Sequence, residues 1–309
     1  MNKKNYLIIV VGPTAIGKTA LAIKLAQHFN TEITSCDSRQ FFKEMEIGTA
    51  VTTPNELAQA KHHFIQNRSI HENYNVGDYE REVLPHLDTL FKENNIQIVV
   101  GGSGLYVDAI LKGFDSFPDV DEKIRAEIEQ KYNELGIEYL QNQLEKLDLE
   151  YFNKIKEENP QTLVNQQRMK RFVGVSMSSG KPYSSFLNKN EGNRNFTPIL
   201  IGLKADREEM YERINKRVDI MLQNGLLREV ESLYIHKELN ALQTVGYREI
   251  FSFIDGEFDL TFAIEEIKKN TRRFAKRQMT WFKRNENTQW FDYKTNISEI
   301  LNYINLQIK

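Results

Sequence analysis

The chain lacks the features that mark a disulfide-stabilised or membrane-bound protein. Its 309 residues include a single cysteine, Cys36, which excludes an intrachain disulfide and a cysteine-based zinc site. We interpret Cys36 as a small buried hydrophobic residue and expect a cytoplasmic protein. The first apolar run, residues 6–11, is far shorter than the roughly twenty residues of a membrane span. It continues into Gly12 without the cleavage pattern of a signal peptide, so we expect no membrane partner.

The chain also lacks an excess of charge of either sign. Its 41 basic and 43 acidic residues give a net charge of −2, so any contact with a nucleic acid must come from a local basic patch. The hydrophobic fraction of 40% and the charged fraction of 27% are typical of a folded globular protein. His62 and His63 have no metal-ligand spacing to other side chains, and neighbours on a helix point apart. We therefore expect structural roles for them.

The order of apolar patterns predicts an α/β fold. Strand patterns occupy residues 6–11, 32–35, 97–100 and 198–203, and helical patterns occupy residues 19–29, 79–92, 208–223 and 259–284. Strands that alternate with helices predict a parallel sheet flanked by helices. Residues 119–195 are polar and show helical patterns alone, with a loop expected at 176–185. We expect a discontinuous core, 1–118 and 196–309, and an all-helical insertion at 119–195.

Residues 12–19 form a phosphate-binding motif between the first predicted strand and helix. The sequence Gly-Pro-Thr-Ala-Ile-Gly-Lys-Thr has the glycines, lysine and threonine of a P-loop, and predicts a P-loop NTPase-like core. Backbone N–H groups, the helix dipole and the Lys18 ammonium would bind a diphosphate, and Thr19 can offer a hydroxyl to Mg²⁺. The residues expected to bind the diphosphate or nucleotide are Gly12, Pro13, Thr14, Ala15, Ile16, Gly17, Lys18 and Thr19.

Two more predicted strands end in polar or glycine-rich segments. Asp37 follows the strand at 32–35 and should lie near the P-loop, because neighbouring parallel strands share one carboxyl edge. It could accept a proton, bind Mg²⁺ through water, or form an Asx turn. The strand at 97–100 is followed by Gly-Gly-Ser-Gly, where P-loop ATPases usually place a metal-binding Asp. Its absence favours a donor whose leaving group is pyrophosphate. Of Arg213 and Arg217, we expect one to reach the phosphates and the other to face solvent.

The C-terminal part of the chain contains a concentrated basic segment. Between Lys268 and Arg284 there are eight basic residues and no acidic one, with aromatic residues interleaved. Such a stripe can bind an RNA backbone and stack on unpaired bases. The alternative is an amphipathic helix whose aromatic residues fill the core, and we expect both roles. A smaller basic group, 167–171, lies in the insertion.

Taken in order, these segments resemble the tRNA dimethylallyltransferase family, also called tRNA isopentenyltransferases. The matching segments are 12–19, 37–40, 47–50, 101–106, Arg217 with 225–226 and 229–230, 245–249 and 271–282. The resemblance implies transfer of a dimethylallyl group from dimethylallyl diphosphate to N6 of the adenosine immediately 3′ of the anticodon, in tRNAs that read codons beginning with U. It implies tRNA and dimethylallyl diphosphate as partners and Mg²⁺ as cofactor, and we expect a monomer.

The resemblance also implies roles for individual residues. Asp37 would be the general base, with Ser103, Arg217 and Lys18 as further catalytic residues, and Thr19 and Asp37, the latter through water, would hold the metal. The expected tRNA contacts are Asp37, Ser38, Arg39, Gln40, Ser103, Arg125, Gln167, Arg168, Met169, Lys170 and Arg171, to which the basic helix adds Arg272, Arg273, Lys276 and Arg277. Ser103 stands where the family usually has Thr, which keeps the hydroxyl.

Two other interpretations remain open at this stage. A P-loop kinase acting on a small molecule or nucleotide would also use Asp37 as a base, although it would not need the basic aromatic helix. An RNA-binding protein that holds a structural nucleotide would keep both motifs without catalysis. In the insertion, Phe172-Val173-Gly174 departs from the Ala-Leu-Glu that usually follows the family's arginine, so its local contacts are not predicted.

Overall fold

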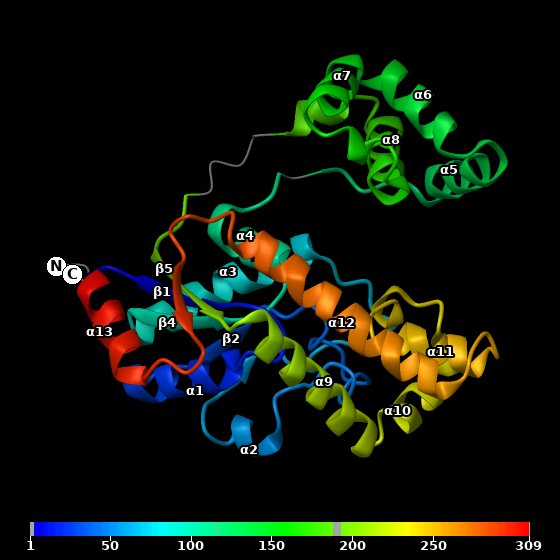
Figure 1. Ribbon diagram of the computed structural model, residues 1–309. Helices are drawn as coiled ribbons and strands as arrows, with labels where there is room; N and C mark the ends of the chain where they lie inside the picture. The colour runs from blue at the N-terminus through cyan, green and yellow to red at the C-terminus, as the bar shows by residue number, and fades with distance from the viewer. Residues whose placement is uncertain (1–2, 116, 188–192, 309) are drawn as a thin grey trace. The chain divides into compact units, whose positions relative to one another are not determined.

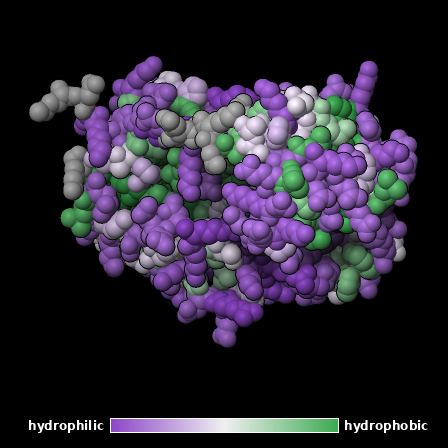
Figure 2. All heavy atoms as spheres, turned by 90° about the horizontal axis from the view of Figure 1, so that it is seen from above, coloured by the Kyte–Doolittle hydropathy of each residue, from purple (hydrophilic) through white to green (hydrophobic). Residues whose placement is uncertain are grey.

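The computed structural model describes residues 3–115, 117–187 and 193–308. The chain divides into two compact units, one formed by Met1–Leu111 and Arg194–Lys309 and the other by Lys112–Asn193. The domain boundaries expected at 118 and 196 stay a prediction, because compactness does not show that the parts fold independently. Within the described residues, no helix is long and apolar enough to cross a membrane. The face in Figure 2 is largely hydrophilic, with small separate hydrophobic areas.

The first unit is built on a parallel sheet, which confirms the predicted fold class. In the described part of the chain the sheet has six strands in the order β3-β2-β4-β1-β5-β6, and every neighbouring pair is parallel. The strands are β1 (Tyr6–Val11), β2 (Ile33–Ser35), β3 (His62–His63), β4 (Ile96–Val100), β5 (Thr197–Lys204) and β6 (Gln289–Asp292). His62 and His63 therefore lie in a strand and not in a helix, and His63 pairs with Glu32.

Helices cover both faces of this sheet, as Figure 1 shows. Alternate residues of β1 point to opposite faces. Ile8 and Val10 pack with α1 (Lys18–Phe29) and α13 (Ile297–Gln307), while Leu7 and Ile9 pack with α3 (Val76–Glu93), α4 (Gly104–Lys112) and the end of α12 (Leu260–Phe282). The unit also contains α2 (Pro54–Leu57), α9 (Arg207–Gln223), α10 (Leu226–Ser232), α11 (Tyr247–Ile254) and the short 3-10 helices Tyr234–His236 and Asn240–Leu242. Cys36 is fully buried, as expected.

The second unit is helical and has its own apolar core. Its elements are α5 (Glu122–Leu135), α6 (Ile137–Leu147), α7 (Leu149–Glu158), α8 (Gln166–Ser179) and the 3-10 helices Pro160–Thr162 and Tyr183–Phe186. Leu140, Leu144 and Val173 are fully buried in it. The loop predicted at 176–185 is wrong for most of its length, because α8 continues to Ser179 and a 3-10 helix begins at Tyr183. The turn itself is short and contains Gly180, whose φ of 65° ends α8.

Candidate active site

Three loops meet at the carboxyl edge of the sheet. They follow β1, β2 and β4, which are adjacent in the sheet, and they carry residues 12–17, 36–40 and 101–103. The first loop depends on Gly12, whose φ is +147° and where a Cβ would lie 2.7 Å from the carbonyl oxygen of Leu203. Helix α1 begins at Lys18, so its free N–H groups face this loop. The geometry is that of an anion-binding site.

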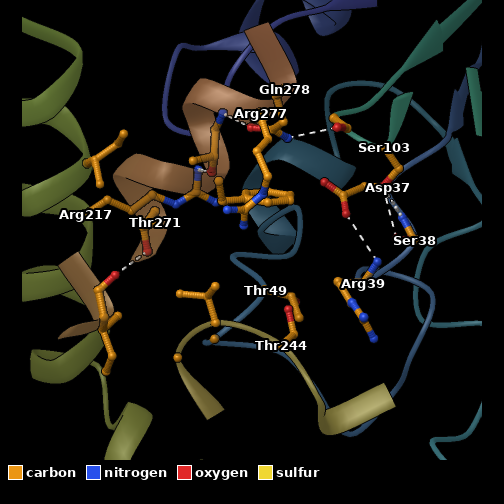
Figure 3. A pocket seen from close by; sticks show the side chains of 18 of the residues that line it. Asp37, Ser38, Arg39, Thr49, Ser103, Arg217, Thr244, Thr271, Arg277 and Gln278 are labelled. Carbon is orange, nitrogen blue, oxygen red and sulfur yellow. Dashed lines mark hydrogen bonds between the residues drawn. The ribbon is translucent and has the colours of Figure 1, made fainter. Parts of the chain in front are cut away.

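Two cavities open beside these loops and share part of their lining. One, of about 480 Å³, contains Ser103, Tyr106 and Trp281 in its wall, and the other, of about 540 Å³, is lined by residues 14–20 of the P-loop segment. The residues common to both are Thr14, Asp37, Thr49, Arg217, Phe274 and Gln278. These residues therefore lie where the cavity beside the P-loop meets the cavity with aromatic walls. Figure 3 shows Asp37, Thr49, Arg217 and Gln278 among the side chains around one pocket.

Three cationic side chains converge on the P-loop. The Lys18 ammonium donates a hydrogen bond to the Pro13 carbonyl oxygen at 2.8 Å, and Arg217 donates to the Thr14 hydroxyl at 3.4 Å. Arg213 donates from Nε to the Ala15 carbonyl oxygen at 2.9 Å. Both arginines thus contact the loop, so the expectation that one of them would only face solvent is wrong, and which of them reaches a phosphate stays a prediction.

Burial disfavours the charged forms of Lys18 and Arg217. The pKa of Lys18 is lowered to about 8, mainly by burial; the Asp37 carboxylate opposes this decrease and the neighbouring Arg217 contributes to it. Burial likewise lowers the pKa of Arg217, again opposed by Asp37. A bound diphosphate would relieve this penalty by placing negative charge beside both groups. The site is therefore electrostatically matched to an anion.

Asp37 lies at the junction of the two cavities and is held by its own loop. Its Oδ1 atom accepts the backbone N–H of Arg39 at 3.2 Å, so the Asx turn considered from the sequence is present. The Ser103 hydroxyl accepts the backbone N–H of Ser38 at 3.0 Å and lies 3.0 Å from the Ser38 hydroxyl. Ser103 therefore fixes the loop that carries Asp37, and the turn leaves the carboxylate facing both cavities.

Gln278 of α12 is a site residue that the sequence analysis missed. Its Oε1 atom accepts the backbone N–H of Thr14 at 2.8 Å, and its Nε2 atom donates to the Gly102 carbonyl oxygen at 2.8 Å. A Cβ on Gly102 would lie 2.4 Å from Nε2. Glycine at a position without a positive φ signals such a close approach, but it does not identify the neighbour.

Trp281, one turn further along α12, makes a similar contact. A Cβ on Gly104 would lie 2.2 Å from Cδ1 of the Trp281 ring, and the indole N–H donates to Asp108 at 3.1 Å. The alternative of an amphipathic helix that fills the core is thus realised on this face of α12. The helix holds the loops after β1 and β4 in a fixed relation.

The basic side chains of α12 point in different directions. Arg272 donates to Asn215 at 2.7 Å and lies over the Tyr211 ring, so it ties α12 to α9. Arg277 lies over the Phe274 ring and lines the cavity with Ser103. Arg273 and Lys276 are exposed. Arg273 also donates to the Asn270 side chain at 3.2 Å, and both exposed side chains can be reached by a large anionic partner.

Arg39 and Gln40, two of the expected tRNA contacts, bind within the protein. The Arg39 guanidinium donates to the carbonyl oxygens of Asn240 and Ala241, at 3.1 and 2.8 Å. The Gln40 amide donates to the carbonyl oxygens of Thr49 and Ala50, at 3.3 and 2.9 Å. Both side chains therefore organise the cavity wall.

The remaining expected contacts lie in the second unit. Arg125, Gln167, Arg168 and Arg171 are exposed, whereas Met169 is buried in the apolar core of that unit. Lys170 pairs with Glu129 at 2.7 Å, and Arg171 lies over the Phe117 ring. Arg125, Gln167, Arg168 and Arg171 are therefore the side chains of this group that a ligand in solvent can reach.

Comparisons with known proteins agree on one family. A family model described as IPP transferase matches residues 40–285. The tRNA dimethylallyltransferase of Flavobacterium johnsoniae is 69% identical over 299 residues, covering 97% of each chain. The tRNA dimethylallyltransferase of Flavobacterium psychrophilum is 66% identical over 305 residues, covering 99% of each.

Solved structures give the same picture at lower identity. The full-length tRNA isopentenylpyrophosphate transferase of Bacillus halodurans is 33% identical with a TM-score of 0.72, covering 99% of this chain and 97% of that one. A eukaryotic dimethylallyltransferase acting on tRNA has a TM-score of 0.79 and covers 98% of this chain and 77% of that one. Its identity of 24% shows the shared fold alone.

Proposed function

The chain belongs to the IPP transferase family. Because it is 69% and 66% identical to two tRNA dimethylallyltransferases over nearly its whole length, we infer that it transfers a dimethylallyl group to tRNA. We propose dimethylallyl diphosphate as the donor and N6 of the adenosine 3′ of the anticodon as the acceptor, in tRNAs that read codons beginning with U. The observation that carries this proposal is the position of Asp37 where a phosphate-binding cavity joins a cavity with aromatic walls.

The P-loop side of the junction suits the departure of a diphosphate. When the bond between the allylic carbon and the diphosphate oxygen breaks, negative charge develops on the leaving group. The P-loop N–H groups, Lys18 and Arg217 are already directed at this region and can stabilise that charge. The buried setting strengthens these interactions, because the local dielectric is lower than that of water.

The other side of the junction suits an extruded adenine base. The exocyclic amine is a weak nucleophile, so it gains from being held against the allylic carbon. Asp37 would accept its proton as the new bond between nitrogen and carbon forms. A base in an anticodon loop can leave the stack at lower cost than a base in a duplex. Ser103 supports the reaction by holding the Asp37 loop.

The donor set fits Mg²⁺ bound mainly by the substrate. Among the described residues, no group of three His, Cys, Asp or Glu side chains could hold a metal. Thr19 and Asp37 line the phosphate cavity, and Mg²⁺ commonly combines one or two protein oxygens with phosphate oxygens and water. The ion would neutralise charge on the diphosphate.

We further propose that the protein works as a monomer in the cytoplasm.

The exposed basic residues support a role in tRNA binding. Arg273 and Lys276 of α12, and Arg125, Arg168 and Arg171 of the second unit, offer their side chains to solvent, and the neutral amide of Gln167 is exposed beside them in the sequence. Cations of this kind contact phosphates and position an RNA without reading its sequence. We propose that both groups bind the anticodon stem-loop region.

Transfer of radiolabel tests the proposal. Purified protein is incubated with labelled dimethylallyl diphosphate, Mg²⁺ and in vitro transcribed tRNA, and label is counted in precipitated RNA. We expect time-dependent incorporation that depends on the enzyme. Absence of label from the RNA, with ATP consumption in the presence of a small acceptor, would favour a kinase instead.

A further inference from the structure

Two of the sequence motifs, 229–230 and 245–249, have no role in the account above. The structure brings Glu229 of α10 and Tyr247 of α11 together against the loop that follows β2. The Glu229 carboxylate accepts three successive backbone N–H groups, from Glu46 at 3.1 Å, Ile47 at 2.6 Å and Gly48 at 2.9 Å. It also accepts the Tyr247 hydroxyl at 2.6 Å. Both carboxylate oxygens are thus occupied by donors.

The Tyr247 ring holds the same loop from a second direction. The side chain is fully buried, and a Cβ on Gly48 would lie 2.5 Å from its ring. Gly48 does not need glycine for its backbone angle, so the close approach explains the residue. Carboxylate and ring together form a clamp on the backbone at 46–48, which we call the loop clamp.

The clamped loop leads to Asp37 by a short chain of contacts. Thr49 lines both cavities, and Gly48 lines the one that contains Ser103. The carbonyl oxygens of Thr49 and Ala50 accept the Gln40 amide. The backbone N–H of Gln40 in turn donates to the Asp37 carbonyl oxygen at 3.1 Å. The position of the loop is thereby transmitted to the loop that carries the carboxylate.

We propose that Glu229 and Tyr247 are positioning residues for the transfer reaction, which fix loop 46–50 and, through Gln40, the carboxylate of Asp37. This inference rests on the proposed function, since it concerns the same site. The hydrogen bonds of these two residues run to loop 46–48 and to each other, whereas Lys18 and Arg217, the side chains proposed to hold the diphosphate, donate to the P-loop. The clamp therefore acts on the chemical step and on the acceptor side, and not on capture of the donor.

The substitution Glu229→Gln tests the clamp with little change in side-chain volume. Whichever way the amide turns, its NH₂ group faces a donor that the carboxylate accepted. We expect kcat to fall about tenfold or more, because a charged acceptor of several hydrogen bonds is lost. The KM for dimethylallyl diphosphate should stay within about twofold. Tyr247→Phe keeps the ring against Gly48, and its kcat should fall only about threefold.

Glu231→Gln is the matched control, since Glu231 is exposed on the same helix. Amide hydrogen exchange at 46–48 gives a readout that does not depend on activity, and exchange should be faster in Glu229→Gln alone. If the wild-type protein transfers no label, the proposed function fails, whatever the exchange shows. If the wild type is active and Glu229→Gln exchanges faster at an unchanged kcat, the positioning role is overturned. A fall in kcat that merely follows a fall in Tm, with Tyr247→Phe equally affected, would also overturn it.

Discussion

Gln278 accepts a hydrogen bond from the backbone N–H of Thr14 at 2.8 Å, although 264 positions separate the two residues in the chain. The same side chain donates to the carbonyl oxygen of Gly102, so it joins the loops that follow β1 and β4. Helix α12 thus has two functions in one segment. Its buried face fixes the loops after β1 and β4, while its exposed basic side chains face solvent.

Replacement of Gln278 by alanine should weaken donor binding. The Thr14 N–H and the Gly102 carbonyl would lose their shared partner, and each such loss costs about 1 kcal/mol or more. We expect the KM for dimethylallyl diphosphate to rise about tenfold, measured by label transfer at saturating tRNA. Thr280 is exposed and lies two residues after Gln278 on the same helix, so Thr280→Ala should leave this KM unchanged. An equal effect of both substitutions would contradict a specific role for Gln278.

Donor binding should weaken as the pH rises through about 8. Burial lowers the pKa of Lys18 to about 8 in the folded protein, from 10.5 as the ordinary value. Above that pH the free protein loses the ammonium that the diphosphate needs. We expect kcat/KM for dimethylallyl diphosphate to fall with rising pH, and the inflection near pH 8 to disappear in Lys18→Met. Persistence of the inflection in this variant would assign it to another group.

The same shift in pKa has the opposite sign for folding. Between about pH 8 and 10.5 the unfolded chain binds a proton at Lys18 that the folded chain does not. The free energy of unfolding therefore gains a contribution that rises with pH over this window, and the burial penalty is fully present below it. Denaturant titrations of the wild type and Lys18→Met should differ in this slope. Identical pH profiles of the free energy of unfolding would show that folding does not lower the pKa of Lys18.

Replacement of Asp37 by asparagine should abolish most of the transfer activity. The substitution keeps the Asx turn to the Arg39 N–H but removes the proton acceptor. We expect kcat to fall about 10²- to 10⁴-fold, the range for loss of a general base. Binding of tRNA, measured by filter retention, should stay within about threefold. Asp206→Asn, at an exposed position before α9, is the control, and a comparable loss of kcat there would remove the argument for Asp37.

The exposed cations of α12 should contribute to tRNA affinity through charge. The double substitution Arg273→Gln and Lys276→Gln removes two charges without touching Gln278 or Trp281. We expect weaker tRNA binding and a slope of log affinity against log salt that is smaller by about two. Lys24→Gln, exposed on α1, should change neither. An unchanged salt slope in the double variant would place the tRNA elsewhere on the protein.

The sequence predicts the central sheet and its main helices well. Buried parallel strands are continuous apolar runs, and for this reason the pattern at 6–11 coincides with β1. The P-loop motif likewise predicts where α1 begins, because the loop must end at a helix N-terminus. Strands β3 and β6 were not predicted. The first has only two residues, and the second lies at the sheet edge with Gln289 and Asp292 exposed.

The supporting contacts of the site could not be predicted in the same way. Gln278 and Glu229 are polar residues in helices, and the loop backbone groups that they bind lie more than 170 positions away in the chain. Nothing in a local pattern distinguishes them from solvent-facing residues such as Lys276. The resemblance for Arg39 and the basic stripe for Arg272 predicted RNA contact, which stays a prediction, and neither indicated that these side chains also bind other parts of the protein. Only the fold decides which polar groups face inward.

Mass analysis of nucleosides is the most direct test of the central claim. In vitro transcribed tRNA that reads a codon beginning with U is incubated with the protein, dimethylallyl diphosphate and Mg²⁺, and is then digested to nucleosides. The account predicts an adenosine heavier by one dimethylallyl group, which disappears when the adenosine 3′ of the anticodon is replaced. If a correctly folded wild-type protein leaves only unmodified adenosine in the digested tRNA, the account is contradicted.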